Sequence, residues 1–403
     1  MLTYSLDWLG LLIRWLHVVA GIAWIGASFY FVWLDNHLQP VSDPAAADPE
    51  VAGEVWAVHG GGFYRSRKYR VAPEQLPPTL HWFYWEAYTT WLSGFALLCL
   101  LYFLRAEAYL IDPAVAALSK PAAIGIAMAA LIGGWIVYDL LCRSALARHE
   151  GWLATTLCAL CAAEAYGLCQ VFSGRGAFLI FGASLGTIMV ANVAMVIIPG
   201  QRELVRAKQQ GRQVDPAPGL RGKQRSVHNT YFTLPVLFTM ISNHYAMTYG
   251  ARYNWLVLIA LSGAGACVRA WFVARHRAQH RRGFAVALPV VAGVLMLVIV
   301  VLLAPAHSSV SPAAVAAPAA GQLAHVRSIV QQRCVPCHAL APTQPGFVAP
   351  PQGLVFENLE QLTAHVPEVQ QQLSMHAMPL GNLTHMTEDE RAQVLQWIAQ
   401  DRY

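Results

Sequence analysis

Cys334-Val335-Pro336-Cys337-His338, near the end of the chain, is the segment that decides the fold of the C-terminal part. Two thiols three positions apart can bond to both vinyl groups of a haem, and the imidazole that follows can ligate its iron. A zinc site would need a second pair of ligands, and the other C-x-x-C pair, Cys158 and Cys161, lies in an apolar run without a following histidine. The motif therefore predicts a covalently bound haem c, an oxidising compartment and electron transfer.

The second axial ligand of this haem is predicted from the residues that follow the motif. Met378, in a Met-Pro pair, is the favoured candidate, because a methionine thioether opposite a histidine raises the reduction potential and suits an electron acceptor. Its rivals in the same stretch are Met375, His376 and Met386. The predicted iron ligands are therefore His338 and Met378.

Two helices are predicted around the haem. Residues 323–333 carry apolar side chains at helical spacing before the motif. Thr387 and Glu390 have the spacing of a capping box, which begins a second helix after the methionine. The stretch 323–403 therefore resembles a class I cytochrome c domain.

The composition of the rest of the chain is typical of a membrane protein. Of 403 residues, 56% are hydrophobic and 12% are charged, whereas about a quarter of the residues of soluble domains are charged. We predict an all-α fold, with a polytopic transmembrane helix bundle of about eight spans over residues 1–303, an Ala/Pro-rich linker over 304–322, and the cytochrome c domain. The spans are expected over residues 8–34, 82–104, 121–141, 152–172, 176–198, 228–249, 254–273 and 284–303.

Lysine and arginine residues predict the orientation in the bilayer. Alternate loops carry seventeen of them on one side and four on the other, and basic loops stay in the cytoplasm. Both termini and the haem domain are therefore expected in the periplasm of a bacterial inner membrane. The formal charge of +5 is explained by these topological signals, so no nucleic-acid partner is expected.

Ionisable residues inside predicted spans are costly and usually functional. His17 in the first span and His244 in the sixth lie at matching depth near the outer surface, which suggests that they ligate a haem b. The alternative is an interhelical hydrogen bond. A second group of polar residues is expected near the cytoplasmic surface: Asp35, His81, Glu86, Asp139, Asn192, His228 and Asn229.

Two glycine patterns suggest that another group approaches the backbone closely, a ligand in the first pattern and a helix in the second. The first predicted cytoplasmic loop contains His59-Gly-Gly-Gly-Phe-Tyr64, whose glycines would let a ligand approach the backbone, with Arg65 or Arg67 to bind an anion. Positive-inside charges followed by an interfacial aromatic belt are the alternative interpretation. Gly182 and Gly186 form a G-x-x-x-G pattern, which favours packing within the bundle over dimerisation.

The opening span, the His59 to Tyr64 loop and the C-terminal Cys-x-x-Cys-His domain together resemble the bacterial membrane-bound urate hydroxylases, the cytochrome c-linked urate oxidases. The resemblance covers essentially the whole chain. It implies an enzyme of purine degradation that oxidises urate to 5-hydroxyisourate with water as the oxygen source. Two electrons would pass to the chain's own haem c and on to an external cytochrome c or a terminal oxidase.

The inner polar residues suit such a reaction, which needs a base and groups that orient a planar anion. His81, Glu86 and His228 are candidate catalytic bases, and Asn229 with Asn192 would hold the imide edges of urate. If urate binds on the cytoplasmic side, the bilayer core of about 30 Å requires an intermediate electron carrier, which a haem at His17 and His244 would supply. The alternative functions are a quinol-to-cytochrome c electron-transfer protein without a purine site and, with less support, a haem-tethered sensor or transporter.

Overall fold

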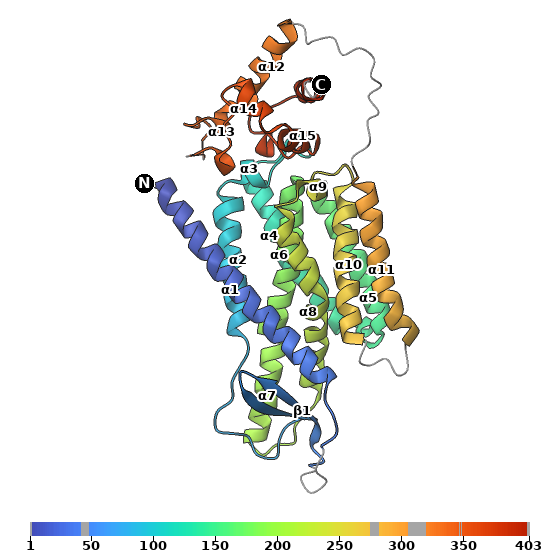
Figure 1. Cartoon of the computed structure of the whole chain (residues 1–403). Helices are drawn as coiled ribbons and strands as arrows, with labels where there is room; N and C mark the ends of the chain where they lie inside the picture. Colours follow the sequence, from blue (N-terminus) through green and yellow to red (C-terminus); the bar gives the residue numbers. More distant parts are fainter. Residues whose placement is uncertain are drawn as a thin grey trace.

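The computed structural model of the chain describes residues 2–41, 48–274, 282–304, 320–345, 347 and 349–400. They form a bundle of long helices with a smaller helical domain at one end (Figure 1). The long helices of the bundle are α1 (Leu2–Asn36), α2 (Trp85–Leu97), α4 (Lys120–Arg143), α5 (Glu150–Cys169), α6 (Gly174–Asn192), α7 (Ile198–Gln209), α8 (Ala217–Ser242), α10 (Asn254–Ala274) and α11 (Arg282–Leu302). Shorter elements connect or extend them: the π-helices η2 (Leu98–Phe103) and η4 (Val193–Ile197), the 3-10 helix η3 (Ala145–Arg148), and α3 (Ala106–Tyr109) and α9 (Ala246–Tyr249).

The prediction of a mostly helical chain with several apolar helices is confirmed. Within the described residues, five helical stretches are long and apolar enough to cross a membrane: Ser5–Asn36, Lys120–Arg143, Glu150–Cys169, Gly174–Gln209 and Asn254–Ala274. A shorter apolar stretch covers Val286–Leu302. Every expected span overlaps a helix, but α8 begins with a basic segment, and α2 ends after 13 residues and continues as a π-helix. The count of eight spans stays a prediction.

Helix α6 is the centre of the bundle, and most of its side chains are buried. Gly182 explains its close contact with α8: a Cβ atom at this position would lie 1.9 Å from Thr239 Oγ1. Gly186 has no atom within 4 Å of such a Cβ. The G-x-x-x-G pattern therefore packs within the bundle through its first glycine, as the sequence favoured.

A β-hairpin replaces the expected glycine loop, so the chain is not entirely α-helical. Strand β1 (Val51–His59) pairs antiparallel with β2 (Gly62–Tyr69), and Gly60 and Gly61 form the turn with φ values of +58° and +81°. A two-residue turn of this kind needs positive φ at both positions, which explains the glycines. Nothing lies within 4 Å of a Cβ at either position, so the turn accounts for these two glycines, and the approach of a ligand to them stays a prediction.

The C-terminal domain has its own apolar core, which includes Val326, Val330, Leu362, Val394 and Ile398. Its elements are α12 (Ala320–Arg333), α13 (Val335–His338), η5 (Pro351–Gly353), α14 (Leu359–Thr363), α15 (Val366–Ser374), η6 (Leu380–Asn382) and α16 (Glu388–Gln400).

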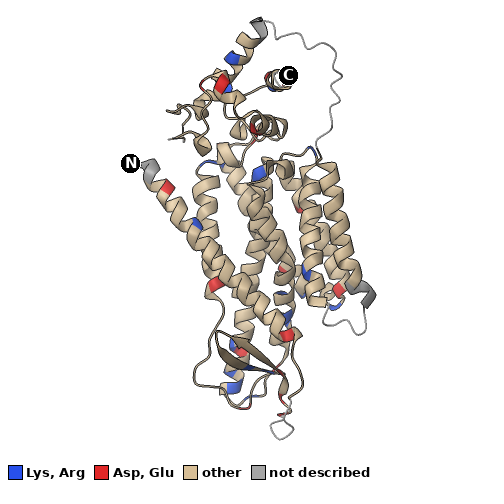
Figure 2. Cartoon of the chain, viewed as in Figure 1, with Lys and Arg blue, Asp and Glu red and all other residues tan. Residues whose placement is uncertain are grey.

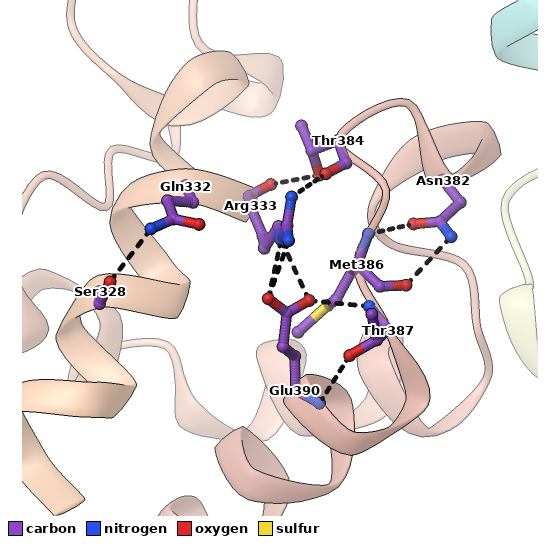
Figure 3. A network of polar contacts seen from close by, with 8 residues as sticks. All are labelled: Ser328, Gln332, Arg333, Asn382, Thr384, Met386, Thr387 and Glu390. Carbon is purple, nitrogen blue, oxygen red and sulfur yellow. Dashed lines mark hydrogen bonds and ion pairs between the residues drawn. The ribbon is translucent and has the colours of Figure 1, made fainter.

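The predicted capping box is confirmed in this domain. Thr387 N donates to Glu390 Oε2 at 2.8 Å, and Glu390 N donates to Thr387 Oγ1 at 3.2 Å (Figure 3). Arg333, at the end of α12, pairs with the same carboxylate at 2.8 Å. This one glutamate therefore joins the two helices that the sequence predicted.

The domain lies against the bundle at α3 and α9 (Figure 1). A Cβ at Gly381 would be 2.8 Å from the carbonyl oxygens of Glu107 and Ala108, and one at Gly250 would be 2.1 Å from the Met375 carbonyl oxygen. Two separate points of backbone contact therefore hold the domain against the bundle. Most of the predicted linker, 304–322, lies outside the described residues.

Candidate functional site

Five of the predicted cofactor residues line one cavity of about 390 Å³ between the C-terminal domain and the bundle. This interdomain cavity is lined from the domain by Cys334, Cys337, His338 and Met378, and from the turn after α8 by His244. Both cysteines are free thiols. Of the four candidates for the second axial position, only Met378 lines the cavity. A thiol pair, an imidazole and a thioether facing one space are the donor set that a covalent haem c requires.

The ring of His338 is oriented by the backbone. His338 Nδ1 lies 2.9 Å from the Leu354 carbonyl oxygen and donates to it, which leaves the Nε2 lone pair available. Burial lowers the pKa of His338, so the ring is neutral at neutral pH. A neutral imidazole held by a carbonyl in this way is the usual state of a metal-binding histidine.

The rivals of Met378 have other surroundings. Met386 is buried in the core of the domain, with 2% of its surface exposed. His376 Nε2 pairs with Glu388 at 3.0 Å on the surface, and this bond lowers the pKa of Glu388. The Met375 carbonyl oxygen lies against Gly250 of the bundle.

His17 lies between α1 and α2. Its Nδ1 is 2.9 Å from the Thr90 carbonyl oxygen and 3.2 Å from Ser93 Oγ, and a Cβ at Gly94 would be 2.8 Å from its Cε1 atom. The interhelical hydrogen bond that the sequence left as an alternative is therefore present. His17 does not line the interdomain cavity that His244 lines. The haem b shared by these two residues stays a prediction.

A buried polar network joins α4, α6 and α8. Asn192 Nδ2 donates to Tyr138 Oη at 3.1 Å and to Asn229 Oδ1 at 2.9 Å, and Tyr138 Oη lies 2.8 Å from His228 Nδ1. Asn229 Nδ2 also donates to a backbone carbonyl of α6 at 2.9 Å. Asn192, His228 and Asn229, which were predicted at one depth, therefore belong to one hydrogen-bond network. Tyr138, which was not predicted, is its fourth member.

Arg225 is the charged member of this network, and sequence reasoning missed it because it was counted among the loop charges. Its side chain donates to Asp139 Oδ1 at 2.7 Å and lies over the ring of Tyr138 at 4.9 Å. The available signal was its position: Arg225 lies three residues before His228, where the sequence of α8 changes from basic to apolar.

A larger cavity, of about 1040 Å³, lies at the hairpin end of the bundle. This hairpin cavity is bounded by the C-terminal part of α1, strand β2, residues 81–83, the α6–η4 segment and α8. Its charged lining residues are Arg67, Lys68, Arg70, Lys223 and Asp35. Figure 2 shows Lys and Arg gathered near this end, whereas most of the helix length is uncharged. Lys68 pairs with Asp35 and Arg67 with Glu54, which leaves Arg70 and Lys223 to give the cavity a positive lining that favours an anionic ligand.

Only some of the predicted catalytic residues line this cavity. His81 and Asn229 line it, whereas Glu86 and His228 do not. His228 instead contacts Tyr138 and the Cys142 thiol, the latter at 3.9 Å. Two of the four candidate residues therefore line this cavity, and the catalytic roles of all four stay predictions.

The two hairpin arginines proposed for anion binding also have a partner. Arg65 and Arg67 pair with Glu54 at 2.6 and 3.3 Å, and the side chain of Glu54 is 2% exposed. Of the two arginines, only Arg67 lines the hairpin cavity.

Comparison with known proteins identifies a family. The family model described as "Urate oxidase N-terminal" matches residues 3–304, which include the helical bundle and the hairpin and end before the C-terminal domain. No curated protein and no solved structure matches the chain.

Proposed function

The chain belongs to the urate oxidase N-terminal family and is an oxidoreductase related to urate oxidation, and from this premise we propose that it hydroxylates urate to 5-hydroxyisourate. Water supplies the oxygen atom, so urate and water give 5-hydroxyisourate, two protons and two electrons. The family match over the whole bundle carries the proposal. The cationic hairpin cavity supports it, because urate is a planar anion at neutral pH.

The hairpin cavity is the proposed urate site. His81 accepts a proton from the attacking water, and Asn229 binds a polar edge of the purine. Asn192 orients Asn229, and Tyr138 orients His228, which lies outside the cavity and would accept a proton only through Tyr138. Glu86, in the first turn of α2, is the more distant candidate base.

Electrons leave through the C-terminal domain. Cys334 and Cys337 would hold haem c covalently, His338 and Met378 would ligate its iron, and the haem would supply reversible one-electron transfer. In a bilayer about 30 Å thick, the hairpin cavity and the interdomain cavity at opposite ends would need an intermediate electron carrier, which a haem b held by His17 and His244 would supply. The external acceptor is a cytochrome c or a terminal oxidase.

The proposed membrane topology follows from the distribution of basic residues and from the position of the haem c residues. The basic hairpin end faces the cytoplasm, and the C-terminal domain faces the periplasm of a bacterial inner membrane. Haem c attachment needs that oxidising compartment.

Anaerobic spectroscopy of the purified protein tests the proposal. Added urate should reduce the haem c iron, which is followed by its absorption band. Hypoxanthine, a neutral purine, should not reduce it. Pyridine haemochrome analysis should show one haem c per chain together with haem b. If dithionite and quinol reduce the haem c and urate does not, the protein is an electron-transfer protein without a purine site. If haem c is the only haem, the His17 and His244 assignment is wrong.

A further inference from the structure

Arg175, in the first turn of α6, lines the interdomain cavity from the bundle side, and the proposed mechanism does not use it. Its guanidinium carbon lies 5.3 Å from the ring centroid of Tyr249 and 5.9 Å from that of Tyr109. Arg175 Nη2 donates to Tyr249 Oη at 2.8 Å. Two tyrosines that also line the cavity therefore hold this cation in place.

The hydrogen-bonding capacity of Arg175 is only partly used. Among the described residues, its Nε and Nη1 atoms have no acceptor, and the side chain forms no ion pair. Arg175 is half-buried, and neither of these two atoms is enclosed by the surrounding protein. The cavity is therefore lined by a fixed cation with accessible donors.

The other charged residues that line this cavity are Arg333 and Glu368. Arg333 already donates to both oxygens of the Glu390 carboxylate and to the Thr384 carbonyl oxygen. Glu368 lies exposed on the C-terminal domain. Among the described lining residues, Arg175 is thus the cation that is left to bind an anion.

The group proposed for this cavity brings such an anion with it. A haem carries two propionates, which are ionised at neutral pH. A carboxylate taken out of water needs a cation or hydrogen-bond donors, and a guanidinium binds it through parallel N–H groups. We propose that Arg175 binds a propionate of haem c. The inference rests on the proposed function and adds a positioning residue from the bundle.

This contact would join the haem to the bundle as well as to the C-terminal domain. Tyr109 belongs to α3 and Tyr249 to α9, the two helices against which the domain lies. His244, the candidate ligand of the membrane haem, lines the same cavity. Arg175 would therefore hold haem c at the side of the bundle from which its electrons are proposed to come. Its positive charge would also compensate the propionate, which favours the reduced iron.

Redox titration of the purified full chain in neutral detergent tests the contact without urate. In Arg175→Met, the midpoint potential of haem c should fall by about 59 mV, a tenfold change in the one-electron equilibrium constant. The visible spectrum should stay that of the wild type, because the axial ligands are kept. Arg175→Lys keeps the charge but loses the fork, so its potential should lie between the two. The matched control is Arg252→Met: Arg252 lies over Tyr253 at 5.4 Å and does not line the cavity, so its removal should leave the potential unchanged.

Three outcomes would overturn the inference. The first is an equal potential in wild type and Arg175→Met. The second is a lower potential accompanied by loss of the axial methionine from the spectrum, which would show that Arg175 only supports the fold. The third is a difference that appears only after anionic phospholipid is added, which would identify a lipid headgroup as the partner. If urate does not reduce the haem c, the proposed function fails, and the potentials of the Arg175 variants still decide this inference.

Discussion

Asp139 pairs with two arginines of different burial, which makes its replacement a quantitative test of the polar network. Arg225 Nη2 lies 2.7 Å from one carboxylate oxygen, and its side chain is 4% exposed. Arg143 Nε lies 2.6 Å from the other oxygen, but its side chain is 63% exposed. The two bonds are nearly equal in length, so burial decides how much each one contributes to the free energy of unfolding.

Asp139→Asn keeps the shape of the side chain and leaves Arg225 as an uncompensated buried charge. The expected loss is ~3–5 kcal/mol of unfolding free energy. Arg143→Gln breaks the exposed bond to the same carboxylate, and its expected loss is below ~1 kcal/mol. For a helical part of about 300 residues, these values correspond to ~5–8 °C and under ~2 °C in melting temperature.

Thermal unfolding of the purified variants in detergent, followed by far-ultraviolet circular dichroism, measures both changes. The double variant Asp139→Asn with Arg225→Met should recover part of the loss, because no charge then remains buried without a partner. Equal losses in Asp139→Asn and Arg143→Gln, or no recovery in the double variant, would refute the assignment of the stabilisation to the buried pair.

Three further predictions concern packing, pH and the haem. Gly182→Val should destabilise the bundle by ~1–3 kcal/mol through overpacking, whereas Gly186→Val, with open space around it, should leave the melting temperature unchanged. The hydrogen bond from Arg333 lowers the pKa of Glu390, so the stabilisation by this pair is present above the ordinary glutamate pKa and is lost as the pH falls through the lowered value. Limited proteolysis of the full chain from neutral to acid pH should therefore show a weaker pH dependence in Glu390→Gln; an unchanged acid transition would contradict this. Met378→Ala should lower the reduction potential of haem c in a redox titration, and an unchanged potential would exclude Met378 as a ligand.

Local features were predictable because neighbouring residues in the sequence determine them. The capping box of Thr387 and Glu390 and the helix before the Cys-x-x-Cys-His motif are of this kind. The hairpin had an equally local signal, since Gly60 and Gly61 suit a two-residue turn. The strands on either side of these glycines were not predicted.

The candidate site was predictable only in part, because sorting polar residues by depth does not show which way each one faces. Successive helical residues differ by about 100° in direction. His228 therefore contacts Tyr138 on α4, while Asn229 beside it contacts Asn192 and lines the hairpin cavity. Both residues lie at the predicted level, and only one reaches the proposed urate site.

The sequence by itself determined the helical class, the thiol pair with its histidine, and the segregation of basic residues to one end of the bundle, because composition and short spacings do not depend on how helices pack. The tertiary structure decided that Met378 and His244 line the interdomain cavity, that Arg225 has an acidic partner, and that two donor atoms of Arg269 have no acceptor among the described residues. These facts depend on the rotation of each helix and on neighbours distant in the chain. A buried arginine has the same letter whether or not it has an acidic partner, and only packing distinguishes the two cases.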